Sequence, residues 1–165
     1  MAHRRLAGLC AALLLLGCQS GYQRAYDEEL GRLEAEEALR QQAEAEARAQ
    51  AQVEARKYVA VVYFDVGKSM ISEDGYRELQ WFVDQMQPYP TVDVDVKGYA
   101  DATGTEQGNQ ELSEQRANNV ASFLIQQGIP AAQIAPAGFS SNFPDQPNET
   151  AKGRSRNRRA EVRAR

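Results

Sequence analysis

The chain has 165 residues and carries 23 acidic against 19 basic side chains, a formal net charge of −4. This length allows one modest domain with an appendage, and the mild acidity gives no overall attraction to nucleic acid. The one histidine, His3, and the two cysteines, Cys10 and Cys18, all precede residue 19. The rest of the chain therefore cannot build a histidine-dependent catalytic site, a cysteine nucleophile or a Cys/His zinc centre, and we expect neither metal nor cofactor.

Residues 1–17 have the pattern of an export signal. Arg4 and Arg5 precede an apolar run, residues 6–16, that is too short to span a bilayer comfortably as a helix. The pattern predicts that the protein leaves the cytoplasm. Two interpretations of its end stay open at this point: ordinary cleavage beside an incidental cysteine, or lipidation of Cys18.

The sequence Leu15-Leu16-Gly17-Cys18 resembles the lipobox of bacterial lipoproteins. The resemblance implies cleavage just before Cys18 and acyl chains, palmitate among them, attached to that residue. Several acyl chains on one protein give stable anchoring, because each buried methylene contributes about 0.8 kcal/mol. Gln19 in place of Asp further implies sorting to the outer membrane.

Residues 18–58 predict a helical spacer behind the lipidated cysteine. From residue 22 the composition is dominated by Ala, Glu, Gln and Arg, without a single proline. An apolar seam begins at Tyr26, Leu30 and Leu33, but charged side chains follow, so a long coiled coil is not expected. We expect a charged helix, with disorder as the alternative, and either state would hold the next domain at a distance.

Residues 59–165 alternate between strand and helix patterns. Strands are predicted at 59–64, 91–97, 134–139 and 160–165, from β-branched runs or from apolar residues alternating with polar ones. Helices are predicted from Ser72 to about residue 87 and at 108–127, from apolar residues at helical spacing.

A loop between the second strand and the second helix carries a candidate binding pair. Asp101 follows the strand among turn-forming residues, and Arg116 lies in the helix beyond it. An ionised Asp accepts from an ammonium and an Arg can grip a carboxylate, so together they suit a small zwitterion. Alone, however, such a pair is more commonly a helix-end residue and a solvated face residue.

The spacing around this pair resembles the peptidoglycan-binding signature of the OmpA C-terminal-like domain. The pattern D-x2-G-x4-N-x2-L-S-x2-R-A occurs at Asp101, Gly104, Asn109, Leu112, Ser113, Arg116 and Ala117. Two flanking blocks, at 63–65 and 153–161, agree with it, and the match covers residues 59–163. The resemblance implies an α+β fold, arranged βαβαββ, with a four-stranded mixed sheet and two main helices packed on one face.

The resemblance also implies a role for each matched residue. Asp101 would receive the ammonium, and Arg116 the carboxylate, of the diaminopimelate side chain in the peptide stem of peptidoglycan. Asn109 would shape the loop and contact the ligand. Three further residues would line the rim: Phe64, Asp65 and Leu112. Asn157 and Arg158 would close the site or support it from behind. Tyr99 stands where many members of the family have His, and that position is expected to flank the pocket.

We therefore interpret the chain as a non-catalytic tether between outer membrane and cell wall, with the domain of residues 59–165 facing the periplasm. Its expected partners are peptidoglycan and, through acyl chains on Cys18, the outer membrane. A wall hydrolase using Asp65 or Asp101 is disfavoured, because no second carboxylate, nucleophile–base pair or metal cluster accompanies either in sequence. The alternative is an adaptor or regulatory lipoprotein of an envelope complex, which contacts a periplasmic protein and uses the domain for localisation.

Overall fold

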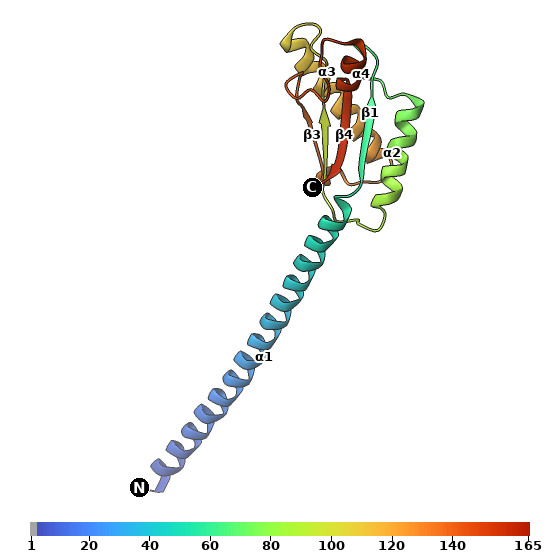
Figure 1. Cartoon of the computed structure of the whole chain (residues 1–165). Coiled ribbons are helices and arrows are strands. Elements are labelled where there is room, and N and C mark those ends of the chain that lie inside the picture. Colours follow the sequence, from blue (N-terminus) through green and yellow to red (C-terminus); the bar gives the residue numbers. More distant parts are fainter. Residues whose placement is uncertain (1–2) are drawn as a thin grey trace. The chain divides into compact units, whose positions relative to one another are not determined.

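The computed structural model describes the backbone of residues 3–165 and the side chains of residues 21–165. Cys18 thus lies outside the described side chains, and its lipidation stays a prediction. The chain divides into two compact units, Met1–Ala47 and Arg48–Arg165. The elements, shown in Figure 1, are α1 (His3–Ala55), β1 (Val59–Tyr63), α2 (Glu73–Met86), β2 (Val94–Gly98), α3 (Glu106–Gln126), a 3₁₀ helix (Ala131–Gln133), β3 (Ile134–Gly138), α4 (Ala151–Asn157) and β4 (Arg159–Ala164).

The described part of the first unit belongs to α1, which confirms the helical prediction for the spacer. Its side chains are exposed from residue 21 to the end of the unit. Ion pairs between side chains one turn apart stabilise this helix only weakly, because water screens them. Examples are Arg32 with Glu29 at 2.6 Å and Arg40 with Glu44 at 3.5 Å. No helix in the described part of the chain has an apolar stretch long enough to cross a membrane.

The second unit holds a four-stranded mixed sheet, as predicted, in the order β1-β4-β2-β3. β4 is antiparallel to both of its neighbours, whereas β2 and β3 are parallel. The parallel pair requires a crossover connection, and α3 supplies it. The last turns of α1 belong to this unit, where Ala55 is fully buried.

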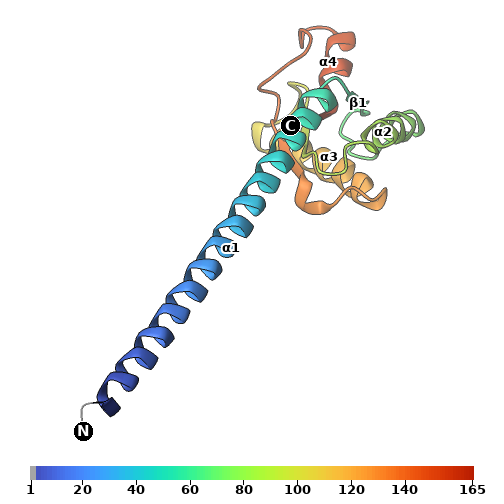
Figure 2. The ribbon, with the colours of Figure 1, turned by 90° about the horizontal axis from the view of Figure 1, so that it is seen from below.

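The core lies between one face of the sheet and the two main helices, α2 and α3 (Figures 1 and 2). Alternate strand residues such as Val62, Val96 and Val162 point into it, because successive side chains of a strand lie on opposite faces. Ser72 caps α2 and Thr105 caps α3, each by accepting a hydrogen bond from a backbone amide of the first turn.

The third helix of the second unit, α4, was not predicted from the sequence. Thr150 caps it by accepting from the amide of Gly153. A side chain at Gly153 would place its Cβ 1.8 Å from the carbonyl oxygen of Pro147, so only glycine allows this close approach. The short helix ends at Asn157, so Arg158 lies directly between it and the first residue of β4, Arg159.

Candidate functional site

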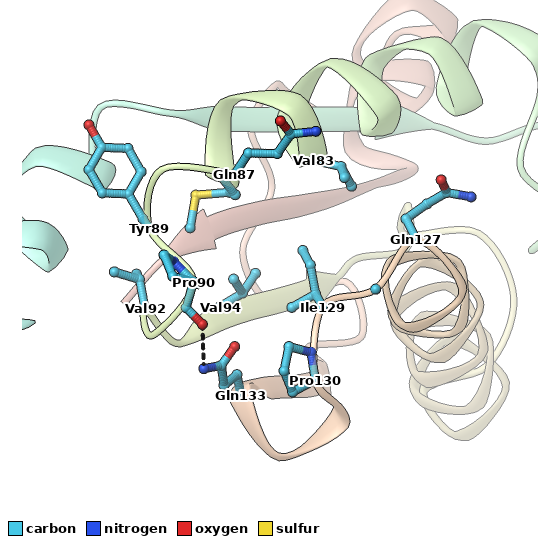
Figure 3. Close-up of a pocket in the computed structure, with 12 residues that line it drawn as sticks. Val83, Gln87, Tyr89, Pro90, Val92, Val94, Gln127, Ile129, Pro130 and Gln133 are labelled. Carbon is cyan, nitrogen blue, oxygen red and sulfur yellow. Dashed lines mark hydrogen bonds between the residues drawn. The ribbon is translucent and has the colours of Figure 1, made fainter.

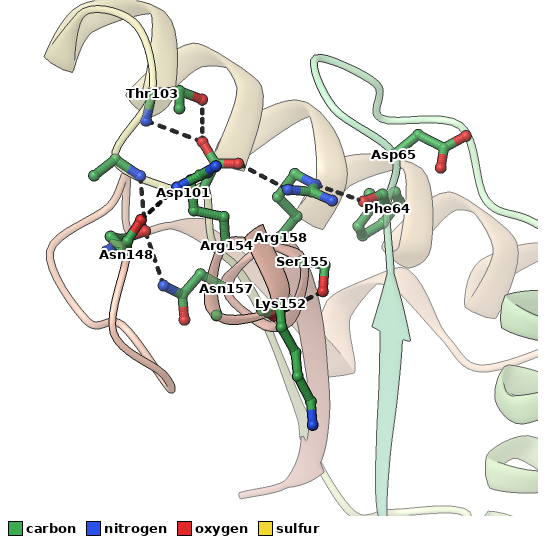
Figure 4. Close-up of polar contacts among 12 residues, drawn as sticks. Phe64, Asp65, Asp101, Thr103, Asn148, Lys152, Arg154, Ser155, Asn157 and Arg158 are labelled. Atoms are coloured by element: carbon green, nitrogen blue, oxygen red, sulfur yellow. Dashed lines mark hydrogen bonds and ion pairs between the residues drawn. The ribbon is translucent and has the colours of Figure 1, made fainter. Parts of the chain in front are cut away.

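The predicted site residues meet at one end of the sheet. They come from the ends of β1 and β2, from α3, and from the junction between α4 and β4. Figure 4 shows Arg158 lying between Asp101 and Phe64, which are far apart in sequence. The fold thus brings together most of the residues that the family resemblance selected.

Asp101 is buried, with 5% of its surface exposed. Its Oδ1 accepts from the backbone amide of Thr103 at 3.0 Å and from the Thr103 hydroxyl. Its Oδ2 accepts from Nη1 of Arg158 at 2.9 Å. A carboxylate offers roughly four acceptor positions, so three are occupied and one is left.

The hydrogen bonds at Asp101 favour its ionised form. Burial opposes ionisation, but donors on Thr103 and Arg158 outweigh it and hold the pKa of Asp101 below its ordinary value. A carboxyl group that stays ionised cannot deliver a proton at neutral pH. Asp101 therefore carries a negative charge at neutral pH.

Arg116 is fully buried and bound mainly to backbone carbonyls. Its Nε donates to the oxygen of Lys68 at 2.9 Å, its Nη1 to that of Tyr99 at 2.8 Å, and its Nη2 to that of Asp65 at 3.2 Å. The guanidinium also lies over the ring of Phe64, 5.0 Å from the ring centroid. Three of its five N–H groups are thus used, and two are left.

The charge of Arg116 is destabilised where it lies. Burial and the nearby charge of Arg158 lower the pKa of Arg116 to about 10, although Asp101 acts in the opposite direction. Arg116 still carries its proton at neutral pH. An anion that reached it would relieve an unfavourable buried charge.

Arg158, rather than Arg116, is the ion-pair partner of Asp101. Its Nε donates to the carbonyl oxygen of Phe64 at 3.0 Å, and its own carbonyl accepts from the amide of Phe64 at 2.9 Å. These bonds fix Arg158 against the end of β1. The predicted supporting residue is therefore in direct contact with the predicted ligand-binding acid.

Asn157 supports the loop that runs over the site. It is fully buried, and its Oδ1 accepts from the amides of Asp145 and Gln146, both at 2.9 Å. Its Nδ2 donates to the carbonyl oxygen of Gln146 and to Oδ1 of Asn148. Asn148 Oδ1 also accepts from the amide of Ala102, next to Asp101, at 3.1 Å. All the hydrogen-bonding capacity of Asn157 is spent inside the fold, so it acts from behind the site.

The rim residues are placed as follows. Asn109 is 7% exposed; its backbone N–H donates to the carbonyl oxygen of Thr105 at 2.9 Å, and its side-chain amide makes no hydrogen bond to another residue in the described part of the chain. Gly104 approaches it with a φ of +92°, a conformation that favours glycine. Leu112 is half-buried, and Asp65 is exposed, with its carboxylate pointing away from Asp101 in Figure 4.

Tyr99 reaches the site through its backbone, not its ring. Its carbonyl oxygen accepts from Arg116, while its ring lies 4.0 Å from the guanidinium carbon of Arg159 and stacks on Phe139. One buried guanidinium nitrogen of Arg159 has no hydrogen-bond partner among the described residues. The cation–π contact with the Tyr99 ring stabilises the charge of this guanidinium. Tyr99 thus contacts Arg116 through its carbonyl oxygen, while its ring packs against Arg159 and Phe139.

Two hollows in the second unit differ in their chemistry. One, of about 230 Å³, lies where α2 and α3 end, has no charged side chain in its wall and contains none of the predicted site residues (Figure 3). The other, of about 480 Å³, is lined by Phe64, Asp65 and Arg158 together with basic residues of α4. We place the candidate site beside the second, because a zwitterion requires charged partners. The described side chains contain no cluster that could hold a metal ion.

Sequence reasoning missed two residues that build the site. Thr103 donates twice to Asp101, and Asn148 joins the Asp101 loop to Asn157. The spacing Asp-x-Thr, typical of a turn in which the Asp side chain bonds a backbone amide two residues on, could have indicated Thr103. Asn148 had no such signal, because its partners are distant in sequence.

Comparisons with known proteins agree on this part of the chain. The model of the OmpA family matches residues 63–158. Outer membrane porin F of Pseudomonas aeruginosa is 38% identical over 102 residues, which are 61% of this chain and 29% of that protein. Peptidoglycan-binding protein ArfA of Mycobacterium bovis is 37% identical over 102 residues, 62% of this chain and 31% of that protein. The chain thus spans about three tenths of the length of these relatives.

The fold has solved counterparts as well. The crystal structure of the peptidoglycan-associated lipoprotein from Burkholderia pseudomallei superimposes with a TM-score of 0.61 at 24% identity. The superposition covers 64% of this chain and 90% of that one. It supports the architecture of the second unit.

Proposed function

Because the chain belongs to the OmpA family, we propose that its domain of residues 59–165 binds peptidoglycan without catalysing a reaction. One relative, ArfA, is named as a peptidoglycan-binding protein, and another, porin F, is named as a protein of the outer membrane. The family model matches residues 63–158, which include Asp101 and Arg116. The proposal for this chain rests on the chemistry of those two residues.

The proposed ligand is the diaminopimelate side chain of the peptide stem. Its amine and carboxylate share one carbon, so they require one acceptor and a pair of donors close together. Asp101 has one acceptor position left, and Arg116 has two N–H groups left. This remaining capacity is the observation that carries the proposal. Lysine at the same position in a stem lacks the carboxylate and would leave Arg116 without an anion.

Access to Arg116 requires a side chain to move. The guanidinium is fully buried, and the ring of Phe64 lies over one of its faces. In the proposal, Phe64 and Leu112 shift to admit the ligand carboxylate, while the three carbonyl contacts hold Arg116 still. The side-chain amide of Asn109, which makes no hydrogen bond to another described residue, supplies a further hydrogen bond to the ligand.

Wall binding can be measured by co-sedimentation of the purified chain, with Cys18→Ser to prevent acylation, and isolated sacculi. We expect sedimentation with diaminopimelate-containing wall and much less with lysine-type wall. Asp101→Asn and Arg116→Lys should each abolish it, whereas Asp84→Asn, an exposed carboxylate on α2, should leave it unchanged. Thermal unfolding of each variant separates lost binding from lost folding. Equal sedimentation with both walls would refute the zwitterion proposal.

The tether to the outer membrane is a second part of the proposal. It rests on the lipobox that ends at Cys18, on Gln19, and on the charged helix that follows. The test is labelling of cells with radioactive palmitate, followed by separation of inner and outer membranes. We expect label on the wild type in the outer-membrane fraction and none on Cys18→Ser. An unlabelled wild type would exclude lipid anchoring and leave wall binding untouched.

A further inference from the structure

A basic groove adjoins the candidate site on the side of α4. It measures about 480 Å³, and its wall includes Lys152, Arg156 and Arg158 against one carboxylate, Asp65. Phe64 and Met70 supply apolar surface. Three cations facing one acid make the groove attractive to an anion, and the apolar patches suit a short peptide better than a bare ion.

Arg156 is held in position although it is exposed. Its Nη1 donates to the hydroxyl of Tyr63 at 3.0 Å, and its guanidinium carbon lies 5.1 Å from the centroid of the Tyr63 ring. These contacts restrict the rotamers of a long side chain. A preorganised guanidinium loses less conformational entropy when it binds a carboxylate.

Arg158 connects the groove with the candidate site. Its Nε and Nη1 are used by Phe64 and Asp101, but its Nη2 makes no hydrogen bond to another residue in the part of the chain with described side chains. Because Arg158 also lines the groove, one edge of its guanidinium holds Asp101 and the other is available to an anion. A ligand whose amine binds Asp101 therefore has a second binding surface within reach.

We propose that the groove binds a free carboxylate of the same peptide stem whose diaminopimelate side chain is held by Asp101 and Arg116. This inference rests on the proposed function and adds a selectivity to it. Stems with free carboxylates bind better than stems in which those carboxylates are converted to amides. Arg156 and Lys152 determine this preference, and they lie outside the zwitterion site.

The test measures binding of soluble tetrapeptide stems, L-Ala-γ-D-Glu-diaminopimelate-D-Ala, to the purified chain carrying Cys18→Ser. One peptide keeps its D-Glu and D-Ala carboxylates, one is amidated at D-Glu only, one at D-Ala only, and one at both. We expect the doubly amidated peptide to bind roughly tenfold more weakly than the free one, the loss of one charge-assisted contact. The two singly amidated peptides show which of the two carboxylates, that of D-Glu or that of D-Ala, the groove binds.

The variants Arg156→Gln and Lys152→Gln should weaken binding of the free peptide and leave that of the doubly amidated peptide unchanged. Arg163→Gln, which removes the same charge from an exposed site in β4, is the matched control. Equal affinity of the wild type for all four peptides would overturn the proposal that the groove binds a carboxylate, and would leave the proposed zwitterion site unaffected. Equal losses for free and amidated peptides in the variants would also overturn it. No binding of any peptide by the wild type would refute the proposed function and the groove together.

Discussion

Arg158 donates a hydrogen bond to Asp101 over 2.9 Å, joining two residues that are 57 positions apart in sequence. Asp101, which the family resemblance assigns to a ligand ammonium, is therefore already paired with an arginine in the fold. Arg116, the other assigned residue, lies buried behind it on backbone carbonyls. The two assigned residues thus belong to a larger charged cluster, and we expect each to affect stability as well as the proposed recognition.

Asp101→Asn is expected to lower stability at neutral pH by about 1–3 kcal/mol, because Arg158 loses its charged partner. The folded-state pKa of Asp101 lies below the unfolded value of about 3.9. The contribution of the ionised carboxylate is thus complete above about pH 5 and is lost as the pH falls through the folded pKa. Denaturant titrations from pH 7 to pH 2.5 should show the difference between wild type and variant shrinking at the acid end. A constant difference would contradict the assignment.

Arg116→Lys is expected to destabilise the domain by about 3 kcal/mol, although it keeps the positive charge. An ammonium cannot reach the carbonyls of Lys68, Tyr99 and Asp65 with the geometry of a planar guanidinium. The measurement is the midpoint of urea unfolding. Arg77→Lys, at an exposed position of α2, is the control and should leave the midpoint unchanged. Equal stability of the two variants would show that the carbonyl contacts are dispensable.

Gly153→Ala is expected to cost about 2–3 kcal/mol and to weaken wall binding. The added Cβ would meet the backbone of Pro147, so the loop before α4 must move, and with it the support of Arg158. Gly31→Ala provides the contrast, because nothing lies within 4 Å of a Cβ there. The second change should leave thermal unfolding of the domain unaltered. Crystallography or amide exchange of Gly153→Ala would locate the displaced loop.

Asn148→Ala is expected to loosen the loop around Asp101 with a loss of about 1–2 kcal/mol. The substitution removes the side-chain oxygen that accepts hydrogen bonds from the backbone amide of Ala102 and from Nδ2 of Asn157. Both donors then lose this acceptor. Amide exchange should accelerate at Ala102 and across residues 145–148. Asn142→Ala, in the same loop but exposed, should not change exchange at Ala102. If amide exchange at Ala102 were unchanged in Asn148→Ala, the bond from Asn148 would not be what holds the Asp101 loop in place.

Patterns with strong local causes were predictable from the sequence. The alternation of Val92, Val94 and Val96 indicated a strand with one buried face, and all three are buried. Ser72 was expected to begin a helix, and it caps α2. The second strand nevertheless begins only at Val94, three residues after its predicted start at residue 91. Ladder pairing, which defines a strand's ends, depends on neighbours that are distant in sequence.

The parts that escaped prediction depend on tertiary contacts. α4 contains Gly153 and two Ser or Asn positions with low helix propensity, and it is held by the Thr150 cap and by the bonds of Asn157. The pairing of Asp101 with Arg158 could not be read from spacing, because it depends on how β4 enters the sheet.

The position of β4 has a consequence for how the domain forms. β4 comes last among the strands along the chain, yet it lies between β1 and β2 and is the neighbour that joins them. Until it arrives, β1 has no partner in the sheet, and two of the three strand pairings, β1 with β4 and β2 with β4, cannot form. The contacts that close the fold are therefore of long sequence separation, which slows folding. During synthesis the sheet therefore cannot be completed until the residues of β4, up to Ala164, have been made.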